Sequence, residues 1–131
     1  MRTAAACLVL ALSAAPAPAE EGDVQLTTEE FLALMDGRTA HFSRIGRPYG
    51  SEAYHPDRRV IWRDRTGQCM EGTWRSFDDI LCFRYESVSC WRVFRSGERD
   101  EDHYAVSTDG FRVEFDRIVE GAFDCTGAPL S

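Results

Sequence analysis

One segment, residues 46–54, gathers the side chains best suited to recognition chemistry. It contains Arg47, Tyr49, Glu52 and Tyr54 close together. Its glycines and its proline predict a long loop. Exposed tyrosine and arginine side chains are enriched among the residues that dominate binding interfaces. We therefore predict that these four residues bind a partner; the alternative is that the two tyrosines fold back as a lid over one end of the fold, with their hydroxyls outward.

Catalytic chemistry has little support in the sequence. The chain contains no GxSxG, P-loop, GxGxxG or HExxH pattern, and His41, His55 and His103 share no motif. The acidic run before His103 lacks the ligand spacing and the glycine of a calcium loop, so we expect a solvated hairpin tip. Adjacent Asp78 and Asp79 point apart in a strand or turn, which does not suit a glycosidase. The sequence predicts no catalytic residue, no metal, no cofactor and no enzyme activity.

Four cysteines follow the N-terminal region: Cys69, Cys82, Cys90 and Cys125. An even number in a small exported chain predicts two disulfides. Their long, irregular spacing without a CxxC pair argues against zinc. Cys82 and Cys90 flank a turn and could join adjacent strands, which leaves Cys69 for Cys125. A Cys69–Cys82 pairing is nearly as reasonable, and the sequence leaves this choice open.

The first 19 residues predict a signal peptide. Arg2 gives a positive start, a short apolar core follows, and Ala17-Pro18-Ala19 is a small-x-small cleavage pattern. We therefore expect a periplasmic or secreted protein whose mature part, residues 20–131, is one disulfide-bonded β-domain. The apolar core is too short to span a bilayer, so the protein is not expected to be membrane-embedded. A net charge of −7, more negative once Arg2 is lost, argues against nucleic acid as a partner.

The mature chain reads as one helix followed by strands. Thr27 and Glu30 form a capping-box pattern, and Gly37 ends the short helix that follows. From residue 39 onward, apolar and polar residues alternate in short runs that turn residues separate. These runs predict strands at 39–44, 59–63, 68–74, 80–85, 90–95, 103–107, 110–115 and 118–122. We expect a mainly β fold, a small antiparallel β-barrel or meander of the lipocalin-like kind with one short N-terminal helix.

A resemblance adds to this prediction. The segments that carry it are Gly37-Arg38-Thr39, Tyr49-Gly50-Ser51-Glu52, Trp62, Cys69-x-x-Gly72-x-Trp74, Cys82-Phe83-x-Tyr85 and Cys90-Trp91. This pattern looks like that of small exported proteins of uncharacterised function from proteobacteria, and it covers most of the mature chain. The resemblance implies a compact periplasmic β-domain with disulfides and carries no activity across. More loosely, the architecture is similar to lipocalin-like barrels and to periplasmic inhibitors of lysozyme or proteases.

Two functions of different classes follow. The first is a non-enzymatic binding module for an unknown protein, an inhibitor of a basic cell-wall hydrolase being one version, because negative charge speeds that encounter. The alternative is a carrier of a small ligand in a cavity lined by Trp62, Trp74 and Trp91, although in so small a barrel these rings are expected to fill the core. An accessory subunit of an envelope complex is third. A protein partner predicts a solid core, whereas a carrier predicts a real cavity.

Overall fold

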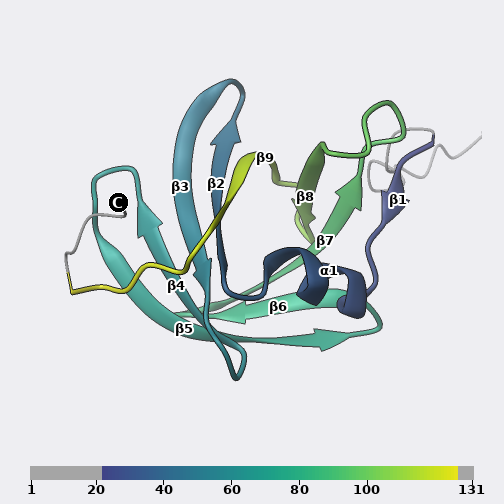
Figure 1. Cartoon of the computed structure of the whole chain (residues 1–131). Coiled ribbons are helices and arrows are strands. Elements are labelled where there is room, and N and C mark those ends of the chain that lie inside the picture. The colour runs from purple at the N-terminus through teal and green to yellow at the C-terminus, as the bar shows by residue number, and fades with distance from the viewer. Residues whose placement is uncertain (1–21, 127–131) are drawn as a thin grey trace, which may run out of the picture.

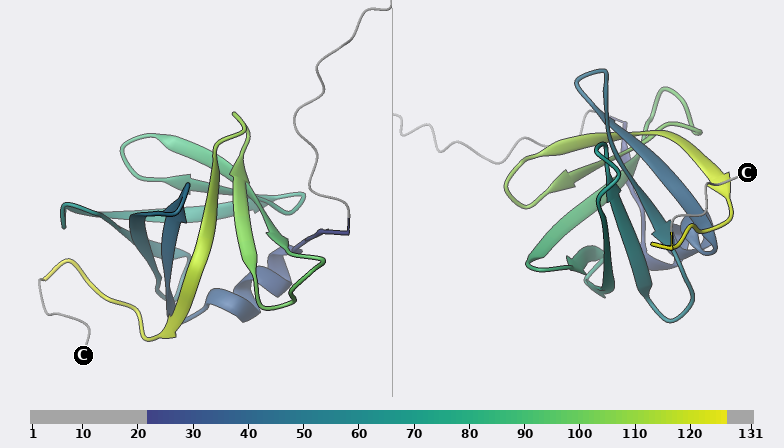
Figure 2. Two further views of the ribbon diagram at one scale, coloured as in Figure 1. Left: turned by 90° about the horizontal axis from the view of Figure 1, so that it is seen from above. Right: turned by 90° about the vertical axis from the view of Figure 1, so that its left-hand side faces the viewer.

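The computed structural model of the protein describes residues 22–126, which form one β-barrel with a short helix at one end (Figures 1 and 2). The elements, in chain order, are β1 (Val24–Gln25), α1 (Thr28–Met35), β2 (Arg38–Arg44), β3 (Arg47–Tyr54), β4 (Arg59–Asp64), β5 (Cys69–Phe77), β6 (Ile80–Arg84), β7 (Val88–Arg95), β8 (His103–Ser107) and β9 (Arg112–Glu120). The predicted signal peptide, residues 1–19, lies outside the described residues.

The barrel is an antiparallel meander that closes on itself. Each strand from β2 to β9 pairs with the next one along the chain, and β9 then pairs with β2. This gives a closed barrel of eight strands, which confirms the predicted fold class. The two-residue strand β1 pairs with the last part of β7, beyond the residues that pair with β6. Closure leaves the long strands without free edges.

The helix is held by the predicted cap and seals one end of the barrel. Thr27 accepts a hydrogen bond from the Glu30 backbone N–H, and the Glu30 carboxylate accepts one from the Thr27 backbone N–H. Phe31 and Met35 point inward and are each only 1% exposed. The turn between β5 and β6 fixes the helix from outside, because Asp79 accepts hydrogen bonds from the backbone N–H and hydroxyl of the first helical residue.

The loop predicted at residues 46–54 is instead the strand β3, which forms a hairpin with β2 and pairs on its other side with β4. Glycine and proline misled the prediction, since both normally interrupt strands. Tyr49 has no partner in the β2–β3 register and forms a bulge directly after Pro48, where a missing N–H is tolerated. A Cβ on Gly50 would lie 2.4 Å from the Trp62 ring, so glycine is needed there for a packing reason.

A second correction concerns the end of the sheet. The separate strands predicted at residues 110–115 and 118–122 are one strand, β9. Its register against β2 skips Asp116, which is therefore a bulge. The Ser43 hydroxyl donates a 2.6 Å hydrogen bond to the Asp116 carboxylate and holds the bulge in place. The interrupted alternation around residue 116 marks this irregularity within a strand.

The disulfides resolve the choice that the sequence left open. Cys69 is bonded to Cys125, and Cys82 to Cys90 across the adjacent strands β6 and β7. The first bond ties down residues 121–125, which cross the outside of β3 and β4. There Phe123 is buried with Ala53 and Ile61 in a small second core. Two disulfides are typical of a protein that folds in an oxidising compartment.

Among the described residues, no helix combines the length and apolar character that a membrane crossing would require.

Candidate functional site

The two ends of the barrel are filled differently. At the helix end, Phe31 packs edge-on against both Tyr54 and Trp74, with ring centroids 5.4 Å apart in each case. Trp74 also stacks on Phe83 at 6.3 Å. These rings form a packed layer across the barrel. At this end, the interior is closed.

Towards the other end, two glycines keep aromatic rings against the wall. The Trp62 ring lies over Gly50, and a Cβ on Gly72 would lie 2.6 Å from the Tyr85 ring and 2.3 Å from the Arg84 carbonyl oxygen. A larger residue at either glycine would push the ring or the neighbouring strand inward. Glycine thus lets a large side chain lie flat beside the backbone. The centre of the barrel stays empty as a result.

The empty space is a cavity of about 260 Å³. Its wall is mainly apolar and aromatic, with residues contributed by almost every strand. The apolar and aromatic lining residues away from the helix end are Phe42, Tyr49, Trp62, Met70, Tyr85, Trp91, Val93, Ala105, Val113 and Phe115. Exposed residues of the β6–β7 turn, Glu86 and Ser87, also line it, so the cavity opens to solvent at that end. This is the general form of a small-molecule site.

One acidic group, Glu52, lies buried in the cavity wall. The Glu52 residue is only 7% exposed to solvent. The Tyr54 hydroxyl donates a hydrogen bond to Glu52 Oε1, and the Tyr85 hydroxyl donates one of 2.6 Å to Oε2. Burial raises the pKa of the Glu52 carboxyl, and the two phenol hydrogen bonds only partly oppose this. Burial likewise raises the pKa of both tyrosines, and the nearby carboxylate adds to the effect.

Glu52 accepts hydrogen bonds from two neutral phenols, and the described part of the chain places no cation in an ion pair with it. None of the ion pairs found among the described residues involves Glu52. A buried charge without a counter-charge is costly, whereas a buried carboxyl group that takes up a proton avoids that cost. The cavity therefore contains a polar anchor that is either protonated or, when ionised, a negative charge that no ion pair of the described residues balances.

The rim of the open end carries a different chemistry. The Arg44 guanidinium lies 3.4 Å from the centroid of the Phe111 ring, and the Tyr49 ring packs against Phe111 and Trp62 at 5.6 and 5.5 Å. Arg44, Arg47, Asp64 and Arg65 border a shallow hollow of about 450 Å³ outside the cavity. This rim is polar and charged, whereas the interior is apolar around one carboxyl group.

The structure separates the four predicted binding residues into two pairs. Glu52 and Tyr54 are inside the barrel and hydrogen-bonded to each other, and Arg47 and Tyr49 lie at the rim near the hairpin tip. The prediction of a loop is wrong for all four residues, which lie on β3. The predicted exposure is wrong for the inner pair, and the Tyr54 hydroxyl does not point outward. Sequence reasoning missed Tyr85, which lies 33 positions away from its partner. Its only signal is that it continues the alternation of Leu81 and Phe83, the inward-facing residues of the strand β6 that it follows.

The tryptophans also divide. Trp74, 3% exposed, fills the core as expected. Trp62 and Trp91 line the cavity, whereas the carrier alternative predicts that Trp74 lines it as well. Each of these two residues is half-buried.

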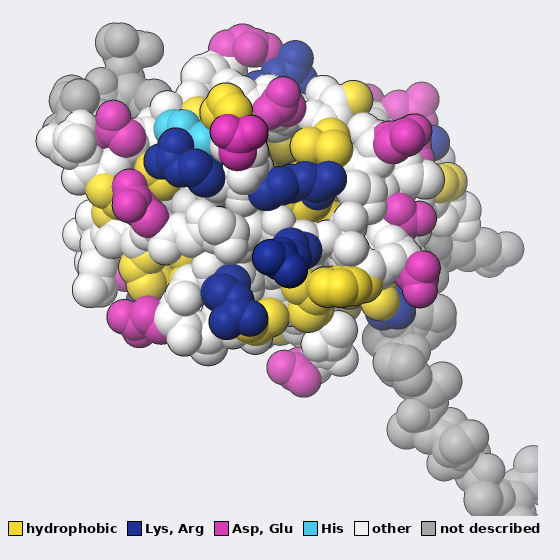
Figure 3. Space-filling view, turned by 90° about the horizontal axis from the view of Figure 1, so that it is seen from below, with side chains coloured by type: hydrophobic (Ala, Val, Ile, Leu, Met, Phe, Trp, Pro, Cys, Tyr) yellow, Lys and Arg dark blue, Asp and Glu magenta, His cyan; other side chains and the backbone are white. Residues whose placement is uncertain are grey.

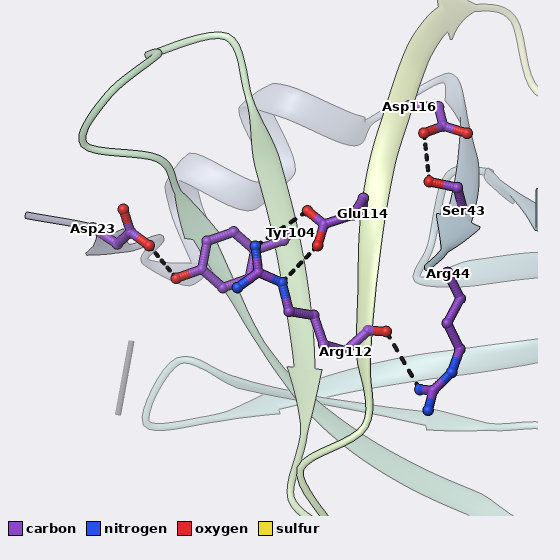
Figure 4. Close-up of polar contacts among 7 residues, drawn as sticks. All are labelled: Asp23, Ser43, Arg44, Tyr104, Arg112, Glu114 and Asp116. Carbon is purple, nitrogen blue, oxygen red and sulfur yellow. Dashed lines mark hydrogen bonds and ion pairs between the residues drawn. The ribbon is translucent and has the colours of Figure 1, made fainter. Parts of the chain in front are cut away.

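The outer surface is held together by polar contacts. On β8 and β9, Arg112 forms a 2.6 Å ion pair with Glu114 and lies 3.8 Å from the centroid of the Tyr104 ring (Figure 4). The Tyr104 hydroxyl in turn donates to Asp23, which joins β1 to the barrel (Figure 4). The hydrogen bonds lower the pKa of Asp23. These contacts are between side chains on the outside of the barrel and brace its strands.

Arginines mark another part of the exterior. Figure 3 views the molecule from the side on which β5 and β6 lie in Figure 1, and arginine side chains are spread there among small apolar areas. The register places Arg59, Arg75 and Arg84 on the outer face of β4, β5 and β6. Within residues 22–126, no group of three or more His, Cys, Asp or Glu side chains could hold a metal ion.

Comparison of the chain with models of protein families, with curated proteins and with solved structures finds no match.

Proposed function

We propose that this protein is a non-enzymatic binding protein that holds a small molecule inside its barrel. The observation that carries the proposal is the cavity of about 260 Å³, walled by aromatic and apolar side chains, with the buried carboxyl group of Glu52 as a polar anchor. Binding sites for small molecules combine such a wall with a few fixed polar groups. An apolar wall with one polar anchor gives both affinity and orientation.

The size of the cavity limits its occupant. Sites for drug-sized ligands have volumes of roughly 300–1,000 Å³. A cavity of about 260 Å³ suits a molecule below that size, of the order of one substituted ring. Half-buried Trp62 and Trp91 offer ring faces for stacking, and aromatic pairs favour offset or edge-on contact. A small aromatic or alicyclic compound fits these surfaces best.

The same proposal includes an exported, lipocalin-like carrier. Two disulfides and the N-terminal pattern that ends at Ala19 support a periplasmic or secreted location, in line with the resemblance to small exported proteobacterial proteins. The eight strands close into a barrel, and one end of that barrel opens to solvent. Lipocalins use this architecture to hold one small ligand. No step of bond chemistry is assigned to the site.

Native mass spectrometry of the protein, purified without denaturation from the cell that makes it, tests the proposal. We expect a small-molecule adduct on the mature chain. The matched control is Ala105→Phe, which adds a ring to the buried inner wall and should abolish the adduct while circular dichroism stays that of a folded barrel. An adduct that persists in Ala105→Phe would place the ligand elsewhere, and a bare wild-type chain that also fails to bind added aromatic compounds would contradict the proposal.

A second candidate function is binding of a protein through the β2–β3 hairpin. The hairpin extends beyond the rest of the barrel (Figure 1), and Ile45 at its tip is 86% exposed beside Arg47 and Tyr49. An exposed apolar tip flanked by arginine and tyrosine is typical of an interface anchor. An inhibition assay with lysozyme, a basic cell-wall hydrolase, compares the wild type with Ile45→Asp. Inhibition that the variant loses supports this function, and absence of inhibition by the wild type contradicts its inhibitor version.

A further inference from the structure

We infer that the cavity selects small organic cations, whose ammonium group pairs with the carboxylate of Glu52 while an attached ring lies against the aromatic wall. This inference rests on the proposed function and names the chemical class of its ligand. Three observations carry it: the geometry around the carboxyl group, the missing counter-charge, and the rings beside it.

The carboxyl group keeps room for a ligand. A carboxylate offers about four acceptor positions, two on each oxygen. In this structure, one hydrogen bond from Tyr54 reaches Oε1 and one from Tyr85 reaches Oε2. Each oxygen therefore has a second acceptor position left, and Glu52 belongs to the cavity wall. The two phenols fix the carboxyl group in position, which spares a ligand the cost of ordering it.

The charge of this group calls for a cation. Tyr54 and Tyr85 are neutral donors, and no ion pair in the described part of the chain reaches Glu52. Two further titratable groups on the cavity wall, Tyr49 and Glu86, lie at the open end, and neither supplies positive charge. A ligand that brings an ammonium group supplies the missing counter-charge, and charge-assisted hydrogen bonds are stronger than neutral ones.

The aromatic side chains favour the same ligand. Trp62 lies directly opposite Glu52 in the β3–β4 register, on the inner face of the barrel. The Tyr85 ring lies over Gly72, and its hydroxyl reaches Glu52. A cation held at the carboxylate would thus lie among ring faces, which attract positive charge through their quadrupoles. The wall farther out, with Trp91 and Phe115, would receive the apolar body of the ligand.

An anionic ligand is the main competing occupant, because arginines border the mouth. Arg44 already lies on Phe111 and donates a 3.5 Å hydrogen bond to the Arg112 carbonyl oxygen. Arg47 and Arg65 are exposed and border only the outer hollow. Those arginines lie in water-screened surroundings, whereas Glu52 is buried. An anion bound in the cavity would bring its negative charge close to the buried Glu52 carboxylate, and this repulsion costs binding free energy.

Isothermal titration calorimetry with three probes of similar shape tests the inference. The probes are 2-phenylethylamine, which is a cation at pH 7, neutral 2-phenylethanol, and the anion 3-phenylpropanoate. We expect the wild type to bind the amine about tenfold or more tightly than the alcohol, and the anion most weakly. Equal binding of the alcohol and the amine, or preference for the anion, would overturn the cation inference but leave the proposed function standing. Failure of all three probes would count against both.

Two variants locate the selectivity. Glu52→Gln keeps the size of the side chain, and its amide still offers partners to Tyr54 and Tyr85; it should reduce the preference for the amine to about twofold or less, with binding of the alcohol retained. Glu71→Gln removes the same charge from the exposed outer face of β5, outside the cavity, and should leave the preference unchanged. An unchanged preference in Glu52→Gln, or a loss in Glu71→Gln alone, would show that Glu52 has only a structural role. If Glu52→Gln does not fold, the ratio measured on the wild type still decides.

Discussion

The two ends of this barrel are built from the same strands and the same kinds of side chain, yet one end is solid and the other is hollow. At the helix end, Phe31 from outside the sheet fills the centre and touches Tyr54 and Trp74. At the open end no helix of residues 22–126 enters, and the rings of Trp62 and Tyr85 lie flat on glycines. The helix therefore supplies the core of one end, and the glycines preserve space at the other.

This difference separates stability from binding. A close-packed apolar interior gives much of the favourable free energy of folding, because it removes apolar surface from water and leaves little empty space between side chains. A hollow lined by apolar groups forgoes that gain, and a native protein keeps one where a ligand completes the packing. We therefore expect substitutions at the helix end to lower stability, and substitutions at the open end to change ligand binding more than stability.

The largest expected effect is that of Phe31→Ala at the helix end. Removal of this 1%-exposed ring should lower the free energy of unfolding by about 3–5 kcal/mol. Trp91→Ala, which truncates a half-buried ring at the open end, should cost clearly less stability but weaken binding of an aromatic probe more. Urea denaturation gives the stabilities and calorimetry the affinities. If Trp91→Ala destabilises the protein as much as Phe31→Ala, the open end is part of the core and the contrast between the ends fails.

Gly72→Ala should break the open end by crowding it. The new Cβ would lie 2.3 Å from the Arg84 carbonyl oxygen and 2.6 Å from the Tyr85 ring. We expect a loss of stability of about 1–3 kcal/mol, because the ring or the strand must move. Movement of Tyr85 should also disturb its hydrogen bond to Glu52 and reduce binding of the amine probe. The control is Thr73→Ala at the neighbouring exposed position; a similar loss there would mean that the strand, and not the ring, is responsible.

The pH dependence of stability should report the buried carboxyl group. Because burial raises the pKa of Glu52 in the folded protein, the folded state holds this proton at pH values where the unfolded state has released it. Stability from this group is therefore complete at acid pH and is lost as pH rises from the ordinary glutamate pKa through the raised one, with a slope of at most about 1.4 kcal/mol per pH unit. Tyr54 and Tyr85, the groups that face it, stay protonated throughout this range.

Glu52→Gln isolates this contribution. The variant removes the titration but leaves the other carboxyl groups and histidines unchanged, so the difference between its stability and that of the wild type should grow in favour of the variant as pH rises. Thermal unfolding at several pH values between 4 and 8 measures the difference. A constant difference across that range would mean that Glu52 titrates in the folded protein as it does in water.

The smallest expected effect comes from the helix cap. Thr27→Ala removes the side chain that accepts the Glu30 backbone N–H and should cost about 1 kcal/mol. Because the cap lies outside the closed end, affinity for the probes should not change. Thermal unfolding and calorimetry test the two parts, and a change in affinity would show that the helix communicates with the cavity.

The fold was largely predictable because alternation and capping are local signals. The capping box at Thr27 and Glu30 and most strands follow from residues close together in the chain. The strand β3 was not, since glycine and proline normally argue against a strand, and the reason for Gly50 is a ring that packs on it from the next strand. A local reading of the sequence contains no information about that contact.

The candidate site was predictable only in part for a similar reason. Glu52 and Tyr54 were predicted as binding residues through their type, but on an exposed loop. The partner that completes the cluster, Tyr85, directly follows β6, and only the closure of the barrel brings it to Glu52. The cavity itself depends on which side chains fail to fill the centre, and that is a property of the whole barrel.

The measurement that tests the central claim most directly is a set of intermolecular nuclear Overhauser effects between bound 2-phenylethanol and the methyl groups of the protein. The alcohol is chosen because the cavity, and not the charge selectivity, is at issue. We predict contacts to the methyl groups of Met70, Ala105 and Val113 on the cavity wall, and none to that of Met35 at the closed end. Contacts only to exposed methyl groups such as those of Val88, or no contacts at saturating probe, would contradict a ligand-binding cavity.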